Sequence, residues 1–253
     1  FLGLNTLFVA LMAHPQFKKV DFSRLKGTNS GGTALVSAVA ERWKSMTGCT
    51  VVEGYGLTET SPVVCANPHG EHSRLGTVGL PVPGTTLKVI DDEGNALPLG
   101  ERGELCGKGP QVMKGYWQRP EATAEVLDEE GWLRTGDIAV IDQDGFVSIV
   151  DRKKDLIIVS GFNVYPNEIE DVVMAHPKVA ACAAIGVADE KSGEAIKVFV
   201  VVKPGESLTK EQVMQHMHDN LTGYKRPRYV EFRESLPTTN VGKILRRELR
   251  DIA

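Results

Sequence analysis

Hydrophobic side chains recur at helical spacing in two stretches near the start of the chain, residues 3–13 and 34–46, and predict two helices. The second stretch stops before Gly48, a residue type that commonly ends a helix. Residues 49–53 predict a short strand, and the polar, glycine-containing residues 28–33 predict a turn. Helix and strand thus alternate in this first part, which is typical of α/β proteins.

The pattern changes between residues 74 and 150, where short β-type runs alternate with turn residues. The expected strands cover residues 85–90, 104–107, 138–141 and 146–150. Asp142-Gln143-Asp144-Gly145 could suggest a calcium loop, but it lacks the further ligands and closing glutamate of an EF-hand, so a hairpin turn is the better prediction. This part predicts a small, mostly antiparallel subdomain.

Five consecutive charged residues, Asp151-Arg152-Lys153-Lys154-Asp155, interrupt the chain next. The expected elements after them are a strand at 156–159, a helix at 167–176, strands at 179–187 and 196–202, a helix at 209–221 and a short helix from about 244. We therefore expect one domain at 1–150, made of an α/β segment at 1–73 and a β-rich subdomain at 74–150, and a second domain at 151–253. The fold class is α/β and α+β. The charged run is either a solvated face or a hinge at 151–155, and its residues favour neither.

The composition fits ordinary globular domains. The 253 residues are 42% hydrophobic and 25% charged, and the formal net charge is −4. Nucleic acid is not an expected partner, because the basic residues are scattered along an acidic chain. Four widely spaced cysteines without a CxxC pattern suggest neither zinc nor a disulfide framework; we expect inert core thiols in a reducing compartment.

Residues 1–13 are apolar, but they are too few to cross a bilayer and lack the features of a signal peptide. The chain also starts on Phe1 inside a predicted helix, without a capping residue. The sequence therefore predicts the later part of a longer protein.

The richest candidate chemistry lies in Gly54-Tyr55-Gly56-Leu57-Thr58-Glu59-Thr60. Tyr55 offers a flat face to a base, Thr58 can donate to a phosphate oxygen, and Glu59 is an oxygen ligand suited to magnesium. The pattern predicts a tight glycine turn that holds a nucleotide and its metal. A glycine turn followed by a helix capped by Thr58 explains the same residues equally well.

Two other motifs carry candidate polar chemistry. Arg134-Thr135-Gly136-Asp137 precedes an expected strand, so Asp137 would emerge from a loop and could accept both hydroxyls of a ribose, or make an Asx turn. Lys243 lies on a glycine-containing loop before the last helix, where it is either an ordinary surface lysine or a group that reaches a distant site when its domain closes.

Taken in order, these motifs resemble those of the adenylate-forming acid–CoA ligases. The resemblance rests on Ser30-Gly31-Gly32-Thr33, Tyr55-Gly56-Leu57-Thr58-Glu59, Arg134-Thr135-Gly136-Asp137, Asp151-Arg152-Lys153-Lys154-Asp155 with Ser160-Gly161-Phe162-Asn163-Val164-Tyr165-Pro166, and Gly242-Lys243. It covers essentially the whole chain. Within the family the chain looks most like a bacterial long-chain fatty-acid–CoA ligase, through residues 109–117, 160–170 and 240–251.

The resemblance implies the end of a large α/β AMP-binding domain followed by a mobile α+β lid domain. It also implies that a fatty acid and ATP form acyl-adenylate, from which coenzyme A displaces AMP. In the adenosine site, Gly31-Gly32-Thr33 would line the adenine, Tyr55 would pack on it, and Asp137 would hold the ribose hydroxyls with Arg152 assisting.

The remaining roles concern phosphate, metal and thiol. By resemblance, Thr58 would touch the α-phosphate and Glu59 would bind Mg²⁺. Lys243 would bridge the reacting carboxylate and the α-phosphate of ATP. Lys154 matches the hinge position, and Gly161 matches the loop beside the channel for the pantetheine of coenzyme A.

One motif of the family is missing. In the family, a Ser/Thr/Gly-rich loop that ends in lysine binds the outer phosphates of ATP, and residues 1–253 contain no such loop. We therefore expect the isolated chain to bind fragments of the ligands at best and to be inactive alone. Alternatives are a sister ligase for another acid, an acyl-AMP ligase, or a non-catalytic nucleotide-binding module. A cytoplasmic enzyme is expected, and a lipid substrate allows peripheral contact with the inner face of the membrane; the sequence does not indicate an oligomeric state.

Overall fold

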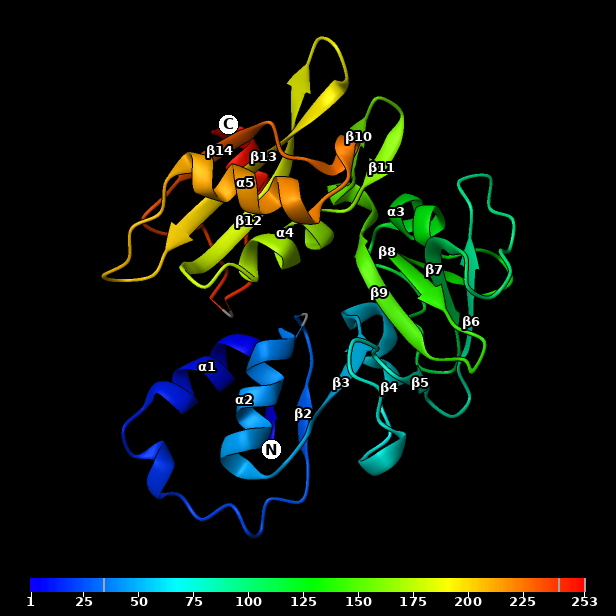
Figure 1. Ribbon diagram of the computed structural model, residues 1–253. Helices are drawn as coiled ribbons and strands as arrows, with labels where there is room; N and C mark the ends of the chain where they lie inside the picture. Colours follow the sequence, from blue (N-terminus) through cyan, green and yellow to red (C-terminus); the bar gives the residue numbers. More distant parts are fainter. Residues whose placement is uncertain (34, 241, 253) are drawn as a thin grey trace. The chain divides into compact units, whose positions relative to one another are not determined.

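A computed structural model describes residues 1–33, 35–240 and 242–252. The chain divides into two compact units, Phe1–Ile149 and Val150–Ala253, which are called unit 1 and unit 2 and are described separately (Figure 1). Ala34, the first residue of the second expected helix, and Val241, in the loop before Lys243, lie outside the described residues.

Unit 1 begins with two helices beside a five-stranded sheet. The helices are α1 (Asn5–Ala13) and α2 (Ser37–Thr47), and the strands, in sheet order, are β1 (Leu2–Gly3), β2 (Thr28–Ser30), β3 (Val51–Gly56), β4 (Val63–Ala66) and β5 (Leu80–Pro81). The strands β1, β2 and β3 are parallel, whereas β3, β4 and β5 are antiparallel. Phe8, Trp43 and Val51 form the centre of the core under the helices. Gly48 ends α2 in the left-handed conformation, as its sequence position predicts.

Two local sequence predictions in this sheet were wrong. Residues 28–33 were expected to form a turn, but Thr28–Ser30 is strand β2, and Thr28 and Ser30 are fully or almost fully buried. Gly54-Tyr55-Gly56 was expected to be a tight turn, but it is the end of β3, paired antiparallel with β4. The turn comes later, at the 3-10 helix Thr58–Thr60, and Leu57 rather than Thr58 occupies its capping position.

The second sheet has four strands in sequence order, β6 (Thr86–Ile90), β7 (Arg102–Lys108), β8 (Leu133–Ile141) and β9 (Val147–Arg152). It belongs to unit 1 except for the end of β9, from Val150 on, where unit 2 begins. The pairs β6/β7 and β7/β8 are antiparallel, in agreement with the predicted subdomain. A short helix that the sequence pattern did not predict, α3 (Pro120–Val126), lies between β7 and β8. Val64 and Cys65 of β4 pack with Val89, Leu105 and Ala139, so the two sheets share one core.

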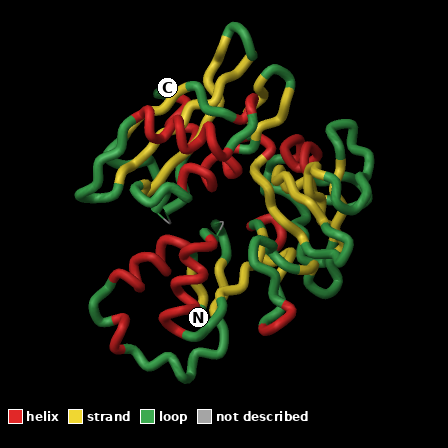
Figure 2. Tube along the Cα trace, in the orientation of Figure 1, coloured by secondary structure: helices red, strands yellow, loops and turns green. Residues whose placement is uncertain are grey.

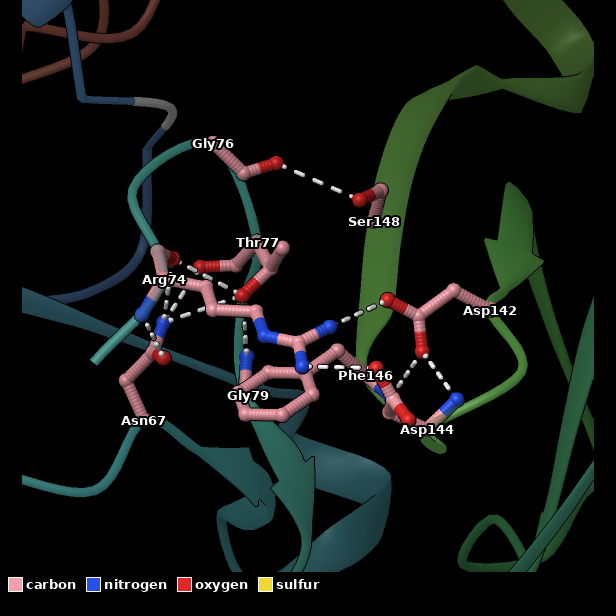
Figure 3. A network of polar contacts seen from close by, with 9 residues as sticks. All are labelled: Asn67, Arg74, Gly76, Thr77, Gly79, Asp142, Asp144, Phe146 and Ser148. Atoms are coloured by element: carbon pink, nitrogen blue, oxygen red, sulfur yellow. Dashed lines mark hydrogen bonds and ion pairs between the residues drawn. The ribbon is translucent and has the colours of Figure 1, made fainter. Parts of the chain in front are cut away.

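Ion pairs join the turn between β8 and β9 to the loop before β5 (Figure 3). Arg74 bridges Asp142 at 2.9 Å and Asp144 at 2.7 Å, and its guanidinium lies 4.0 Å from the centre of the Phe146 ring. The main-chain N–H of Gly145 donates to Asp142 and closes the expected hairpin turn. Arg74 therefore supplies the cationic partner of the two carboxylates that could have suggested a calcium loop.

Unit 2 is a five-stranded sheet with helices on both faces. Its strands are β10 (Ile157–Val159), β11 (Phe162–Val164), β12 (Val179–Asp189), β13 (Gly193–Val202) and β14 (Tyr229–Phe232), and its helices are α4 (Pro166–Met174), α5 (Lys210–Asn220) and α6 (Arg246–Asp251). The order is β11-β10-β13-β12, with β14 parallel to β13. Alternate residues of β12 enter different cores: Cys182 packs in the cluster with Ile169 and Val213, and Ala183 in the cluster with Leu249.

The described residues are a mixture of helices, strands and loops, with the β6–β9 part consisting mainly of strands and loops (Figure 2). Single-turn 3-10 helices occupy Phe17–Lys19, Thr58–Thr60, Gly70–His72, Lys153–Asp155 and Gly223–Lys225. The predicted fold class is confirmed, although the sequence pattern did not predict β1, β4, β5, β11 and β14. None of the helices in the described ranges is both long and apolar enough to span a bilayer.

All four cysteines are buried and free, as the sequence predicts. Burial raises the pKa of Cys65 to about 12 and the pKa of Cys106 to about 11. Burial also raises the pKa of Cys182. Because the thiolate is the reactive form, these raised pKa values favour the unreactive thiol at Cys65, Cys106 and Cys182.

Gly56 allows β3 to approach the chain that returns into β4. A Cβ at this position would lie 1.8 Å from the carbonyl oxygen of Pro62. We expect Gly56→Ala to lower the free energy of unfolding by about 2 kcal/mol or more, because the backbone must shift. Denaturant unfolding followed by tryptophan fluorescence measures this, since Trp43, Trp117 and Trp132 all lie in unit 1.

Gly48→Ala is the matched control in the same unit. Gly48 has a φ of 72° but no neighbouring atom near the site of a Cβ, so its substitution should cost only about 1 kcal/mol, from backbone conformation. Equal losses in the two variants would mean that the contact with Pro62 does not determine the choice of glycine.

Candidate functional site

The end of β2 lies beside β3, where the expected adenine-binding residues meet. The parallel register pairs Ser30 with Glu53, which brings Gly31 next to Gly54. A Cβ on Gly31 would lie 3.7 Å from the Gly54 carbonyl oxygen, so the two backbones are close. Gly32 has a φ of 82°, a conformation that favours glycine. Ligands commonly bind at such carboxyl ends of parallel strands.

Polar side chains fix the segment that follows β2. The main-chain N–H of Leu35 donates to Glu53 Oε1 at 3.2 Å, and the N–H of Val36 donates to Asn5 Oδ1 at 3.2 Å. Burial raises the pKa of Glu53, and the Leu35 N–H opposes that rise. The hydroxyl oxygens of Ser30 and Thr33 are buried and have no hydrogen-bond partner within the described residues. Ser30 belongs to the motif that supports the family resemblance, but sequence reasoning gave a ligand-binding role only to Thr33.

Tyr55 and Asp137 meet although 82 residues separate them. The Tyr55 hydroxyl donates to Asp137 Oδ2 at 2.5 Å. Asp137 is 5% exposed and lies within β8, so the prediction that it emerges from a loop was wrong. The ring proposed for adenine and the carboxylate proposed for ribose are therefore in direct contact.

A bulge in β8 turns Asp137 toward this position. The register with β7 shifts between the pairs Cys106–Arg134 and Glu104–Ile138, and Gly136 within the shift has a φ of 69°. The Gly136 N–H donates to Glu104 Oε1 at 3.2 Å. The Asp137 N–H donates to the hydroxyl of Thr135 at 3.1 Å. Glu104 and Thr135 are thus supporting residues to which sequence reasoning gave no role; the glycine in the motif is the signal that could have indicated a bulge.

The environment holds Tyr55 in its protonated form. Burial and the negative charge of Asp137 raise the pKa of Tyr55 far above its usual value. The hydroxyl therefore remains a donor at physiological pH, and it orients one oxygen of the Asp137 carboxylate.

Thr58 and Glu59 follow β3 in the 3-10 helix Thr58–Thr60, and Thr58 is exposed. Glu59 Oε1 accepts a 2.8 Å hydrogen bond from the hydroxyl of Tyr116, and the Glu59 carbonyl accepts one of 2.7 Å from the N–H of Met113. Sequence reasoning gave Tyr116 no role, although it lies in residues 109–117, a stretch that supports the family resemblance.

The carboxylate of Glu59 fits a metal site in which the substrate supplies some of the ligands. No group of three or more His, Cys, Asp or Glu side chains in the described parts of the chain is arranged to hold a metal ion. Mg²⁺, however, commonly uses one or two carboxylates together with substrate phosphates. The half-exposed carboxylate of Glu59 fits that type of site, and Tyr116 would orient it.

The other predicted site residues lie in unit 2. Arg152 ends β9, Lys154 lies in the 3-10 helix Lys153–Asp155, and both are exposed. Gly161, with a φ of 82°, forms the tight turn from β10 to β11. Lys243 is exposed on the loop before α6. Their roles toward a nucleotide stay predictions.

Two family profiles match the chain. The profile of the AMP-binding enzymes matches residues 1–117, and the profile of the AMP-binding enzyme C-terminal domain matches residues 168–243. The chain therefore belongs to the AMP-binding, adenylate-forming enzymes.

Within that family, the chain is similar to long-chain-fatty-acid–CoA ligases. It is 58% identical over 99% of its length to the ligase of Escherichia coli O6:H1 and 43% identical over 98% of its length to that of Bacillus subtilis, and it covers 44% of each relative. It thus spans less than half the length of these relatives. Feruloyl-CoA synthase from an Amycolatopsis species is 41% identical over 98% of the chain, which covers 50% of that relative.

Solved structures agree with the fold. The ATP-bound MatB of Rhodopseudomonas palustris superposes with a TM-score of 0.92 at 35% identity, over 99% of this chain and 50% of that one. The anthranilate CoA ligase AuaEII in complex with anthranoyl-AMP gives 0.89 at 34% identity, over 100% of this chain and 49% of that one.

The Tyr55–Asp137 contact predicts how the free energy of unfolding depends on pH. Because the pKa of Tyr55 is higher in the folded chain than in the unfolded one, its contribution to stability is complete below the unfolded pKa of about 10. It is lost as the pH rises above that value. Tyr55→Phe should be less stable than wild type at about pH 8, and the difference should shrink by about 1.4 kcal/mol for each further pH unit above 10.

Denaturant midpoints followed by tryptophan fluorescence at several pH values test this expectation. The buried thiols lose stability in the same direction, but they are present in both proteins and cancel in the comparison. Tyr224→Phe, an exposed tyrosine of unit 2, is the control and should leave the profile unchanged. A constant difference between Tyr55→Phe and wild type across this range would contradict the proposed origin of the shift.

Proposed function

We propose that the chain carries AMP-binding and lid segments of a long-chain fatty-acid–CoA ligase. The observation that carries the nucleotide part is the 2.5 Å contact between Tyr55 and Asp137 beside the end of β2, which gathers an aromatic face and a ribose acceptor at one place. The fatty-acid substrate is supported by the 58% identity to long-chain-fatty-acid–CoA ligases. Because the chain covers 44% of those relatives, the activity of the whole protein is a proposal.

In the proposed reaction, the carboxylate of the fatty acid attacks the α-phosphorus of ATP, and diphosphate leaves. The thiol of coenzyme A then attacks the acyl carbon, a base takes its proton, and AMP leaves with the electrons of the broken acyl–oxygen bond. Residues 31–33 and Tyr55 would bind adenine, Asp137 the ribose hydroxyls, and Thr58 the α-phosphate. Mg²⁺ bound at Glu59 would offset the negative charge of the phosphates.

Unit 2 would supply the remaining groups. Lys243 would place positive charge where the carboxylate and the α-phosphate react, and Arg152 would assist at the nucleotide. Lys154 would be the hinge about which unit 2 rotates between the two half-reactions, and the Gly161 turn would line the channel for pantetheine. We further propose that the enzyme is cytoplasmic, with peripheral contact at the inner face of the membrane, and that residues 1–253 alone do not complete the reaction.

The role of Asp137 predicts selective recognition of ribose. Asp137→Asn keeps the shape of the side chain but removes its charge, so AMP should bind at least about tenfold more weakly. Wild type should also prefer AMP to 2′-deoxy-AMP, and the variant should lose most of that preference. Isothermal titration of the complete gene product with both nucleotides measures the two ratios.

Asp21→Asn, an exposed aspartate in a turn of unit 1, is the control and should bind both nucleotides like wild type. If folded Asp137→Asn retained the wild-type preference for AMP, ribose would be bound elsewhere.

The role of Lys243 predicts a difference between the half-reactions. A preorganised charge at the reacting centre is worth about 3 kcal/mol, which is roughly a hundredfold in rate. Lys243→Ala in the complete gene product should therefore slow adenylation of a fatty acid by that factor, and it should affect thioester formation from preformed acyl-adenylate much less. Single-turnover assays of each half-reaction measure the two rates.

Lys191→Ala, an exposed lysine in the β12–β13 turn, is the matched control and should change neither rate. Equal loss in both half-reactions of Lys243→Ala would refute the assignment.

An aryl acid is the second candidate substrate, because feruloyl-CoA synthase is 41% identical to the chain. Adenylation of a panel of long-chain, medium-chain and aryl acids distinguishes the two. Trapping the product with coenzyme A or with an acyl carrier protein distinguishes a CoA ligase from an acyl-AMP ligase.

A further inference from the structure

Unit 2 contains a network of buried charges centred on α6. Arg246 makes two parallel hydrogen bonds to Glu170, Nε–Oε1 at 3.1 Å and Nη2–Oε2 at 2.7 Å. It also donates to Asn167 Oδ1 at 2.8 Å and lies 3.5 Å from Asp155. We call the network the Arg246 cluster; its members are Asp151, Asp155, Asn167, Glu170, Arg246 and Arg250.

Most charges of the cluster are withdrawn from water, although the side chain of Arg250 is 33% exposed. The side chain of Arg246 is 15% exposed, that of Glu170 is 13% exposed, and that of Asp155 is 8% exposed. Burial raises the pKa of Glu170, which Arg246 opposes. Burial lowers the pKa of Arg246, but the neighbouring carboxylates outweigh that effect and raise it. With its charge neutralised in this way, Arg246 is a fixed structural cation rather than a group that can be offered to a substrate.

Three segments that are distant in the sequence meet at the cluster. Asp155 belongs to the charged run at 151–155 and accepts a 2.8 Å hydrogen bond from Arg250 of α6. Asp151, in the same run, accepts one of 2.8 Å from the N–H of Asn167 at the start of α4. Glu170 of α4 also accepts from the N–H of Ala184 in β12 at 2.8 Å. The run that contains Lys154 is thus joined through α4 and α6 to the central sheet.

The loop that carries Lys243 is built directly onto α6. Its stem is closed by the N–H of Thr239 donating to the carbonyl of Lys243 at 2.8 Å and by the N–H of Leu245 donating to that of Pro237 at 2.9 Å. The N–H of Lys243 donates to Thr239 Oγ1 at 3.1 Å. Leu236 and Ile244 pack against the core cluster of Phe199 and Leu249.

We propose that Arg246 is a positioning residue for Lys243, and that the Arg246 cluster fixes α6, and with it the Lys243 loop, against α4. The planar guanidinium can satisfy the Glu170 carboxylate with a fork and Asn167 at the same time, which fixes the rotation of α6 about its axis. Only two residues separate Arg246 from Lys243, so a rotation of the first turn of α6 displaces the loop. The inference rests on the proposed function of Lys243.

The first test compares the half-reactions in Arg246→Gln. This variant removes the fork and the charge but leaves Lys243 in place, so adenylation should slow by about tenfold or more, as for a misplaced catalytic group. Thioester formation from preformed acyl-adenylate should stay within about threefold of wild type. Arg247→Gln is the matched control, because Arg247 is the exposed neighbour on the same helix and no hydrogen bond or ion pair of its side chain is seen among the described residues. It should change neither rate.

The second test is a double-mutant cycle with Lys243→Ala. If Arg246 acts through Lys243, Arg246→Gln should slow adenylation no further once Lys243 is absent. Independent, multiplying losses would overturn the inference, as would equal loss in both half-reactions of folded Arg246→Gln. If Arg246→Gln does not fold, Glu170→Gln replaces it in the cycle, because it weakens the fork without removing a side chain. Glu170→Gln should likewise slow adenylation no further once Lys243 is absent.

The two hypotheses fail in different ways. If Lys243→Ala alone shows no preference for adenylation, the proposed function of Lys243 is wrong. If Lys243→Ala shows the preference but Arg246→Gln and Glu170→Gln leave adenylation unchanged, only the positioning role is wrong.

Discussion

The hydrogen bond between Tyr55 and Asp137 is the constraint on which the candidate nucleotide site depends. Tyr55 lies at the end of β3 in the first sheet of unit 1, and Asp137 lies in β8 of the second. Each group alone would be costly in its half-buried or buried position, because a buried hydroxyl or carboxylate without partners loses its hydration. Together they join the polar edges of two sheets whose apolar faces already share the core around Val64 and Leu105. The same packing that stabilises the unit therefore sets the geometry of the site.

Two glycines in the site are required by the conformation and packing of the backbone. Gly56 is required by the carbonyl of Pro62, and Gly136 allows the bulge that turns Asp137 toward Tyr55. A glycine-rich motif at a strand end can thus result from chain packing, and this explains why the signature stretch at 54–60 admitted two interpretations from sequence alone. What distinguishes a site from a turn here is the set of polar groups that the glycines bring together.

Hydrophobic periodicity predicted the elements whose signal is local. The helix α2 ends at Gly48 as expected, and β12 and β13 appear as strands because their apolar residues line two cores. The strand β2 was missed because its three residues, Thr28–Ser30, are polar and form a strand only by pairing with β1 and β3. The sequence pattern does not show that these strands are neighbours in the sheet. The position of Asp137 was missed for a similar reason, since the bulge depends on the register with β7. The residue types of the site could be read from the sequence, but contacts such as Tyr55 with Asp137 and Glu59 with Tyr116 could not.

Unit 2 uses apolar and charged contacts for different purposes. Leu249 attaches α6 to the sheet through a core of Ala183, Ile185 and Phe199, and that contact is tolerant of rotation because apolar packing is not directional. Buried ion pairs add little net stability compared with apolar groups of similar size, but their hydrogen bonds have fixed directions. The fork from Arg246 to Glu170 therefore determines the orientation of α6 rather than its attachment. The proposed role of Lys243 depends on that orientation, because the loop that carries Lys243 leads directly into α6. A charged side chain stabilises a reacting centre only when it is held at that centre.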